Sequence, residues 1–266
     1  MFPRIFHIYG PLWINSYGLM IAVGFLVFVF LMYKHIKKTK IISSNQFFNI
    51  IFVGLIGGIV GGRIFFLLTN WEDFVGNWPD FFYPWIGGFG ILGVIIGVIV
   101  VVSFYLKINK IPILHILDIA AIYAPLFQSI ARIGCFLAGC CYGIPVSNHF
   151  KLAVIFTNPH SLAPLNIPLH PTQIYLSLTS LFVFLIVFLF SKYFASKFGQ
   201  ILFTYLFLES LSRFTVDFWR GDRVLIACFS FLSYSQVTAF IIFVFALAGF
   251  IYVTKKYKIS KKVIIR

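Results

Sequence analysis

The sequence predicts an all-α membrane protein that crosses a bilayer about seven times. Hydrophobic residues make up 61% of the 266-residue chain and charged residues only 11%, and the mean hydropathy is +0.98. An ordinary soluble domain carries about twice that share of charged residues. Apolar stretches of about 20 residues, long enough to span a bilayer, recur along the chain. In addition, lysines gather between alternate stretches, which indicates the direction of each crossing.

The lysine clusters predict which loops face the cytoplasm. The net charge of +14 would suit a nucleic-acid partner, but 14 of the 21 lysines and arginines fall in four short clusters. Positive loops stay cytoplasmic in membrane proteins, so we expect the N-terminus outside, the C-terminus inside and no nucleic-acid partner. The basic charge is expected to meet anionic membrane lipids instead. The clusters are Lys34, Lys37, Lys38 and Lys40; Lys107 and Lys110; Lys192 and Lys197; and Lys255, Lys256, Lys258, Lys261, Lys262 and Arg266.

The apolar stretches form a single integral-membrane domain, residues 1–266, in this interpretation. A lead-in of residues 1–15 precedes the first span, and Pro125 is expected to kink the fourth. Between the fourth and fifth spans lies an external segment, about residues 140–169, whose prolines exclude a span and whose residues 151–156 alternate like a short strand. The expected spans are 14–33, 46–68, 85–106, 113–138, 170–191, 199–219 and 232–254.

Glycines concentrate in the second and third expected spans. Many are three or four residues apart, and small residues at this spacing let membrane helices approach closely. We therefore expect close helix packing of the second span, in preference to direct ligand contact. In the third span the glycines predict a helix face with little side-chain bulk, or a break near its outer end. The glycines are Gly54, Gly57, Gly58, Gly61 and Gly62 in the second span, and Gly87, Gly88, Gly90, Gly93 and Gly97 in the third.

Arginines within the apolar stretches predict a binding site. A charge at the centre of a bilayer-spanning helix costs roughly 2.5–3.5 kcal/mol, so such residues are usually paired or functional. Arg63, Arg132, Arg213 and Arg220 lie in or at the outer ends of spans and are expected to converge near one leaflet. The guanidinium fork suits phosphate oxygens, which favours a pocket for an anionic headgroup. An ion-pair ladder that only joins helices is the alternative.

Two acids accompany these arginines on the sixth expected span. Arg213, Asp217 and Arg220 are spaced i, i+4 and i+7, so the sequence predicts that they share one helix face. Glu209 lies one turn further inward on that face. Three arginines against few acids leave positive charge for a ligand.

Three of the four cysteines lie close to Arg132 in sequence: Cys135, Cys140 and Cys141. Three interpretations of these cysteines remain open. They could be inert small residues at a tight turn, partners in a disulfide on the oxidising outer side of the membrane, or reactive thiols. A disulfide would join Cys135 to one of the others, because adjacent cysteines rarely bridge. No metal is expected, since Cys-Cys with His149 or His160 has no recognised spacing, and no cofactor is expected.

Five segments, taken in order, resemble the prolipoprotein diacylglyceryl transferase family, and the resemblance covers nearly the whole chain. It implies a membrane enzyme that moves a diacylglyceryl group from phosphatidylglycerol to the lipobox cysteine of a preprolipoprotein signal peptide. This is the first step of bacterial lipoprotein maturation, at the outer leaflet of the cytoplasmic (inner) membrane. The segments are Tyr17-Gly18-Leu19; Gly61-Gly62-Arg63; Trp85 with residues 87–97; Arg132 to Phe136 with His170 to Tyr175; and Arg213, Asp217 and Arg220.

The resemblance also implies roles for particular residues. Arg132 matches the arginine that binds phosphatidylglycerol, and Arg213 the arginine engaged in catalysis. His170 would donate to phosphate or act as a base, with a structural role at the helix start as the alternative. The full implied sets are Arg132, Arg63, Gly134 and His170 for phosphatidylglycerol binding, and Arg213, Tyr17, Asp217 and Arg220 for catalysis.

The chain departs from the common family pattern at several positions. Cys135, Ala138 and Cys140 stand where asparagine, asparagine and glutamate are common; Leu92 replaces a histidine, Leu176 a glutamate, and Asp217 a glutamate. The Gly-Cys-Cys-Tyr-Gly ending resembles a divergent branch of the family. These departures leave two alternatives: a lipid-binding membrane protein without activity, or an enzyme with another thiol or hydroxyl acceptor that uses Cys140 as nucleophile.

Overall fold

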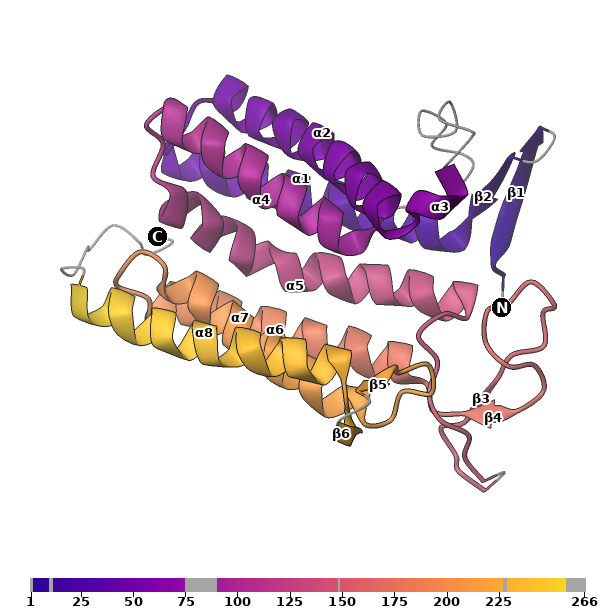
Figure 1. Cartoon of the computed structure of the whole chain (residues 1–266). Helices are drawn as coiled ribbons and strands as arrows, with labels where there is room; N and C mark the ends of the chain where they lie inside the picture. Colours follow the sequence, from indigo (N-terminus) through magenta and orange to yellow (C-terminus); the bar gives the residue numbers. More distant parts are fainter. Residues whose placement is uncertain (1, 10–11, 75–89, 148, 227–228, 257–266) are drawn as a thin grey trace. The chain divides into compact units, whose positions relative to one another are not determined.

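The computed structural model describes residues 2–9, 12–74, 90–147, 149–226 and 229–256, and it is predominantly helical (Figure 1). The chain divides into two compact units. One comprises Met1–Met32 with Leu114–Arg266, and the other is the hairpin-like insertion Tyr33–Ile113. The helices are α1 Ser16–Thr39, α2 Ser44–Thr69, α3 Trp71–Phe74, α4 Ile91–Ile108, α5 Ile113–Ala138, α6 Thr172–Tyr193, α7 Gln200–Asp217 and α8 Tyr234–Lys256.

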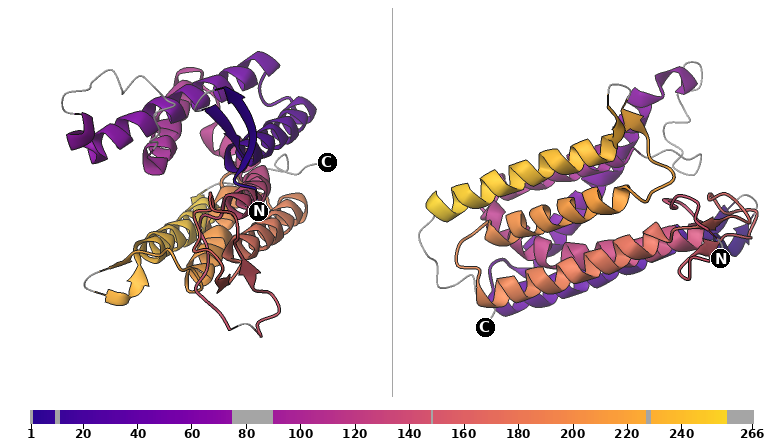
Figure 2. Two further views of the ribbon diagram at one scale, coloured as in Figure 1. Left: turned by 90° about the vertical axis from the view of Figure 1, so that its right-hand side faces the viewer. Right: turned by 90° about the horizontal axis from the view of Figure 1, so that it is seen from below.

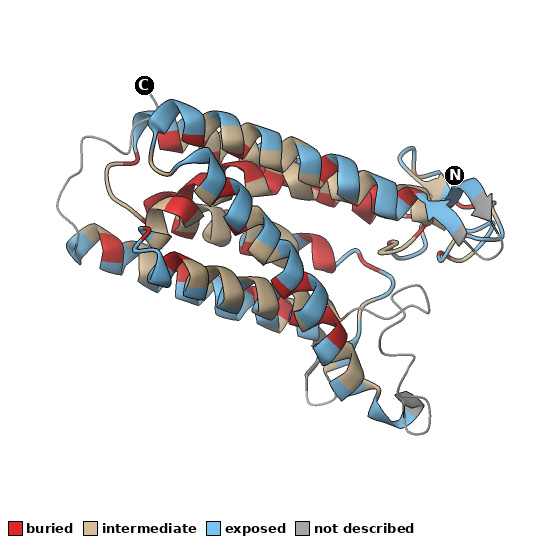
Figure 3. Ribbon diagram, turned by 90° about the horizontal axis from the view of Figure 1, so that it is seen from above, coloured by how far each residue is buried: buried red, intermediate tan, exposed pale blue. Residues whose placement is uncertain are grey.

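The seven expected helices all form within the described ranges. Five of them, α1, α2, α5, α6 and α8, are long and apolar enough to cross a membrane. Large apolar side chains such as Leu26, Phe182 and Phe240 lie exposed along these helices, as expected for contact with lipid (Figure 3). The all-α, multi-pass membrane class predicted from composition is therefore confirmed.

Two boundaries differ from the sequence-based expectation. Helix α1 continues to Thr39, so Lys34, Lys37 and Lys38 lie on its last turns and not in a loop. Lysine is a good helix former, and its charge is favourable near a helix C-terminus. Helix α4 begins at Ile91, while the expected start at residues 85–89 lies outside the described residues.

Within the Tyr33–Ile113 unit, glycines bring α2 and α4 into backbone contact. A Cβ added to Gly97 would lie 2.1 Å from the carbonyl oxygen of Gly57, and one added to Gly93 would lie 2.2 Å from that of Gly61. No side chain fits at such distances. The predicted close packing is confirmed for Gly57 and Gly61, and Gly93 and Gly97 give α4 the facing surface with little side-chain bulk. Gly87 and Gly88 lie outside the described residues.

Within the other unit, α6, α7 and α8 run side by side, and α5 passes through Pro125 without ending (Figures 1 and 2). Helix α7 begins after Gly199, which has a left-handed backbone (φ 88°). The buried carboxylate of Asp118 on α5 accepts hydrogen bonds from the backbone N–H groups of Gly199, at 2.6 Å, and Leu202, at 2.8 Å. A side chain 81 residues earlier thus caps this helix.

Among the described residues, three small antiparallel β-ladders lie outside the helices. The expected short strand is confirmed as β3, Val154–Ile155, which pairs with β4, Pro168–Leu169, beside the small buried core of Phe156, Ala163 and Leu169. The lead-in of residues 1–15 was expected only as a short external segment before the first span. It forms a hairpin of β1, Arg4–Tyr9, and β2, Leu12–Asn15, and a second unpredicted ladder joins β5, Leu225–Ile226, to β6, Phe229–Ser233.

Candidate functional site

Three chain segments meet beyond the ends of α5, α6 and α7. The backbone of Gly143 donates to the carbonyl of His170 at 3.1 Å, and His170 donates back to Ile144 at 3.1 Å. On its other side, Ile144 donates to Trp219 at 2.9 Å, and Gly221 donates to Tyr142 at 2.9 Å. Residues 142–144 therefore join the start of α6 to the end of α7.

Glycine is required where these three segments touch. A Cβ on Gly143 would lie 2.4 Å from the carbonyl oxygen of His170. A Cβ on Gly221 would lie 2.7 Å from the carbonyl oxygen of Gly143. This packing role of the two glycines could not be predicted from the sequence, because only the folded chain shows what each one faces.

The Gly-Cys-Cys turn after α5 is held by side chains from the first turn of α6. Gly139 has a left-handed backbone (φ 80°) and caps α5 through a hydrogen bond to Cys135. Thr172 donates to the carbonyl of Cys141 at 2.7 Å, and Gln173 donates to that of Cys140 at 2.8 Å. Both donor residues are fully buried, so they fix the backbone of the two adjacent cysteines.

Arg132 and Arg213 supply the positive charge of the site. The Nη1 atom of Arg132 lies 3.9 Å from the Sγ of Cys135 and 3.7 Å from that of Cys141. The guanidinium of Arg213 on α7 lies within electrostatic range of Arg132 and Arg220. Its Nη1 atom is buried and has no hydrogen-bond partner among the described residues. A buried donor without an acceptor costs about 1–3 kcal/mol, which an anionic ligand oxygen would recover.

Asp217 and Arg220, by contrast, find partners within the protein. The fully buried carboxylate of Asp217 accepts hydrogen bonds from Ser233 and, at 2.7 Å, from Ser235, and it lies 3.4 Å from Arg220. Arg220 also binds Asp222 through Nε and Nη2, each at 3.0 Å. Hydrogen bonds to Asp222 raise the pKa of Arg220 against the opposing effect of burial.

The expectation that Arg213, Asp217 and Arg220 share one helix face was wrong for Arg220. Helix α7 ends at Asp217, and Arg220 follows in a tight turn whose backbone bridges Gly143. The N–H groups of Trp219 and Arg220 still bond back to Val216 and Asp217 in tight turns. The reason for the helix end is tertiary: the carbonyl of Trp219 accepts from Ile144 and the N–H of Gly221 donates to Tyr142, which draws the chain away from the helix axis.

Tyr17 and Gly134 meet at the contact between α1 and α5. The Cβ that Gly134 lacks would lie 3.3 Å from the backbone of Tyr17 and 2.8 Å from the Cβ of Met20. This absence lets the first turn of α1 lie against α5. Tyr17 remains 38% exposed and lies within electrostatic range of Cys135 and Arg132.

The remaining predicted residues are placed as follows. The ring of His170 hydrogen-bonds the hydroxyl of Tyr175 at 3.2 Å and packs against Phe150, and burial lowers the pKa of this imidazole. Arg63 belongs to the Tyr33–Ile113 unit, where it is buried. The structure thus brings Arg132, Arg213, Tyr17 and Gly134 into one region. The role of Arg63 in phosphatidylglycerol binding stays a prediction.

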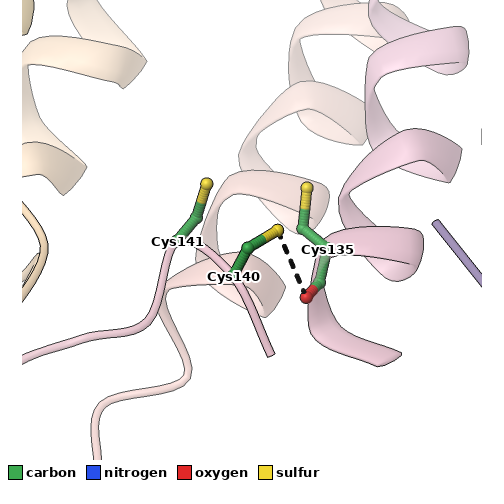
Figure 4. Close-up of side chains that lie close together, drawn as sticks. All are labelled: Cys135, Cys140 and Cys141. Carbon is green, nitrogen blue, oxygen red and sulfur yellow. Dashed lines mark hydrogen bonds between the residues drawn. The ribbon is translucent and has the colours of Figure 1, made fainter. Parts of the chain in front are cut away.

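The sulfur atoms of Cys135, Cys140 and Cys141 all lie within 4.8 Å of one another, and all three cysteines are free (Figure 4). Hydrogen bonds from the thiols of Cys135 and Cys140, together with the nearby charges of Arg132 and Arg220, hold the pKa of Cys141 well below its usual range. The same thiol contacts and burial raise the pKa of Cys140. Of the three thiols, Cys141, next to the arginines, is therefore the one that most readily carries a negative charge.

A cavity of about 830 Å³ opens beside this cluster. Its walls come from the β1–β2 hairpin, the start of α1, the end of α5 and the external segment. The contribution of the hairpin was not predicted, because its pairing gives no clear signal in residues 1–15 of the sequence. The lining includes Arg4, Trp13, Tyr17, Leu19, Cys140 and His160.

Comparison with known proteins identifies the family. The family model described as prolipoprotein diacylglyceryl transferase matches residues 3–252. The chain belongs to this family. The prolipoprotein diacylglyceryl transferase match begins before β1 and ends within α8, so it includes every segment of the site described above.

Curated relatives agree with this assignment. A phosphatidylglycerol–prolipoprotein diacylglyceryl transferase of Clostridium tetani is 40% identical over 84% of this chain and 86% of its own length. A phosphatidylglycerol–prolipoprotein diacylglyceryl transferase 2 of Clostridium perfringens is 33% identical over 79% of this chain and 80% of its own length. A phosphatidylglycerol–prolipoprotein diacylglyceryl transferase of Dehalococcoides mccartyi is 30% identical over 95% of this chain and 94% of its own length.

Proposed function

We propose that this protein is a phosphatidylglycerol–prolipoprotein diacylglyceryl transferase. It moves the diacylglyceryl group of phosphatidylglycerol to the lipobox cysteine of a preprolipoprotein, the first step of bacterial lipoprotein maturation. The name of the relatives and the length of the family match support this reaction. The observation that carries it here is the buried Nη1 atom of Arg213, which has no hydrogen-bond partner among the described residues and lies within electrostatic range of Arg132. This donor offers an anionic headgroup a place to bind.

The proposed topology is a single integral-membrane domain of seven spans in the bacterial inner membrane, with the N-terminus outside and the C-terminus cytoplasmic. The seven spans are the five longer apolar helices together with α4 and α7. Helices α1, α6 and α8 each end in lysines, as the positive-inside rule requires of cytoplasmic ends. The site lies at the opposite ends of α1 and α6, which supports an active site at the outer leaflet.

Arg132 and Arg213 bind the phosphate of phosphatidylglycerol in this proposal. The substrate thiolate attacks the glyceryl carbon bonded to the phosphate oxygen, the C–S bond forms, and the C–O bond breaks. Glycerol phosphate leaves with the electron pair and the negative charge. Fixed guanidinium groups stabilise that charge as it develops. Their positive field also favours the thiolate form of the acceptor cysteine.

The other residues have supporting roles. Asp217 and Arg220 position the end of α7, because their charged groups already bind each other, two serines and Asp222. Tyr17 faces the cavity as a contact for substrate, and Gly134 lets it approach α5. His170, held by Tyr175, and Arg63 are proposed as further phosphatidylglycerol contacts.

The test is transfer of labelled diacylglycerol to a lipobox peptide by the purified protein. Removal of one fixed donor to a developing charge costs roughly 10²–10³ in rate, so Arg132→Ala and Arg213→Ala are each expected to lose at least that much. Lys151→Ala, which removes an exposed cation from the external segment, is the matched control and should retain activity. Normal transfer by Arg213→Ala in a folded protein would refute the assignment. Failure of the unaltered protein to complement a strain without its own transferase would favour a lipid-binding relative.

A further inference from the structure

We propose that Cys135, Cys140 and Cys141 form a binding site for a thiophilic d¹⁰ metal ion, with Zn²⁺ as the ion to test. The inference does not rest on the proposed transfer reaction, because its test measures metal binding and not transfer, although Arg132 borders both sites. It also differs from the sequence-based expectation, which considered only the adjacent cysteines with His149 or His160. The third ligand, Cys135, comes from the last turns of α5.

The distances suit one metal ion better than a disulfide. A zinc–sulfur bond is about 2.3 Å, so three sulfurs around one ion lie roughly 3.8–4.0 Å apart. The three sulfurs here already lie within 4.8 Å of one another and gather on one side of the turn (Figure 4). A disulfide needs about 2.0 Å between two sulfurs and would exclude the third thiol from the bond.

The backbone of the site is held in place before any ion arrives. The left-handed conformations of Gly139 and Cys141 (φ 80° and 57°) turn the chain back over the end of α5. As a result, the thiol of Cys140 lies 3.8 Å from the carbonyl oxygen of Cys135. Thr172 and Gln173 fix the carbonyls of the two adjacent ligands. Partners behind the ligands of this kind typically contribute 10–100-fold to metal affinity.

The charges and donor atoms select the type of ion. Bound thiols are deprotonated, so three thiolates and one Zn²⁺ carry a net charge of about −1. The guanidinium of Arg132, within 4 Å of two of the sulfurs, balances that charge. Sulfur ligands favour Zn²⁺ or Cu⁺ over Mg²⁺ or Ca²⁺, which require oxygen.

The ion has access to the site and retains an open coordination position. Cys140 lines the cavity of about 830 Å³, so an ion can reach the sulfurs from that side. Three protein ligands leave a fourth position for water or another small ligand, as in reactive zinc sites. Structural zinc sites, in contrast, use four protein ligands.

The experiment measures metal binding directly on the full-length protein in detergent, reduced and freed of metal. Zn²⁺ is titrated against a coloured chelator, and Co²⁺ substitution is followed by its thiolate charge-transfer absorption. We expect one ion per chain and the Co²⁺ band. Cys140→Ser and Cys141→Ser should each lower Zn²⁺ affinity at least 100-fold, and Thr172→Val, which keeps every thiol, should lower it roughly 10–100-fold.

Cys228→Ser, which alters the fourth cysteine of the chain, is the matched control and should leave Zn²⁺ affinity unchanged. Size-exclusion chromatography establishes that each variant is folded. A triple variant, with Cys135→Ser, Cys140→Ser and Cys141→Ser, gives the background affinity for Zn²⁺. If the unaltered protein binds Zn²⁺ no more tightly than this variant, the proposal is overturned. Absence of the Co²⁺ band, with mass spectrometry of the unreduced protein finding two of the three cysteines in a disulfide, would overturn it in favour of a redox pair.

Discussion

Replacement of Gly143 by alanine tests whether the backbone contacts beyond the helices position the site. The added Cβ would lie 2.4 Å from the carbonyl oxygen of His170, whereas ordinary contacts are 3.4–4 Å, so the two segments must separate by about 1 Å. The hydrogen bond between Gly143 and His170, now 3.1 Å, would lengthen or break. A lost backbone hydrogen bond and local overpacking together predict a destabilisation of about 2–4 kcal/mol.

The same substitution should also lower the rate of transfer. Residues 142–144 hold both the start of α6 and the turn after α7, and a displacement of about 1 Å in an active site can lower a rate roughly 100-fold. Diacylglyceryl transfer and thermal unfolding in detergent are measured on the same preparations. Gly54→Ala is the control: in α2 its Cβ meets only a methyl group of Val102 at 3.3 Å. Wild-type activity and stability of Gly143→Ala would refute the role given to these contacts.

Three further changes test the framework of the protein. Gly97→Ala would place a Cβ 2.1 Å from the carbonyl oxygen of Gly57, so it should separate α2 from α4 and lower Tm by several degrees relative to Gly54→Ala in a thermal scan. Asp118→Ala removes the acceptor for two backbone N–H groups at the start of α7 and should cost about 2–4 kcal/mol, read from denaturant unfolding; an unchanged midpoint would show that water replaces the cap. Asp217→Asn weakens the contacts to Ser235 and Arg220 and should destabilise by about 1–3 kcal/mol, with faster hydrogen exchange at the start of α8 as the specific readout.

The helices were largely predictable because an apolar stretch in a membrane must satisfy its backbone hydrogen bonds within itself. The expected span 113–138 coincides with α5, and the glycines of α2 and α4 pack as their spacing predicts. Arg132 and Arg213 were identified by the cost of a charge in an apolar run, and the structure places them within electrostatic range of each other.

The tertiary structure decided what depends on contacts between distant segments. Helix α7 ends before Arg220 because residues 219–221 pair with residues 142–144, and no local pattern in α7 reports that pairing. The N-terminal hairpin and the cavity it lines were likewise invisible in residues 1–15. The cysteines show the division most clearly. Their presence near Arg132 could be read from the sequence. The turn that brings the three sulfurs together is held by Thr172 and Gln173 of α6, more than 30 residues later, and no local pattern reports those bonds.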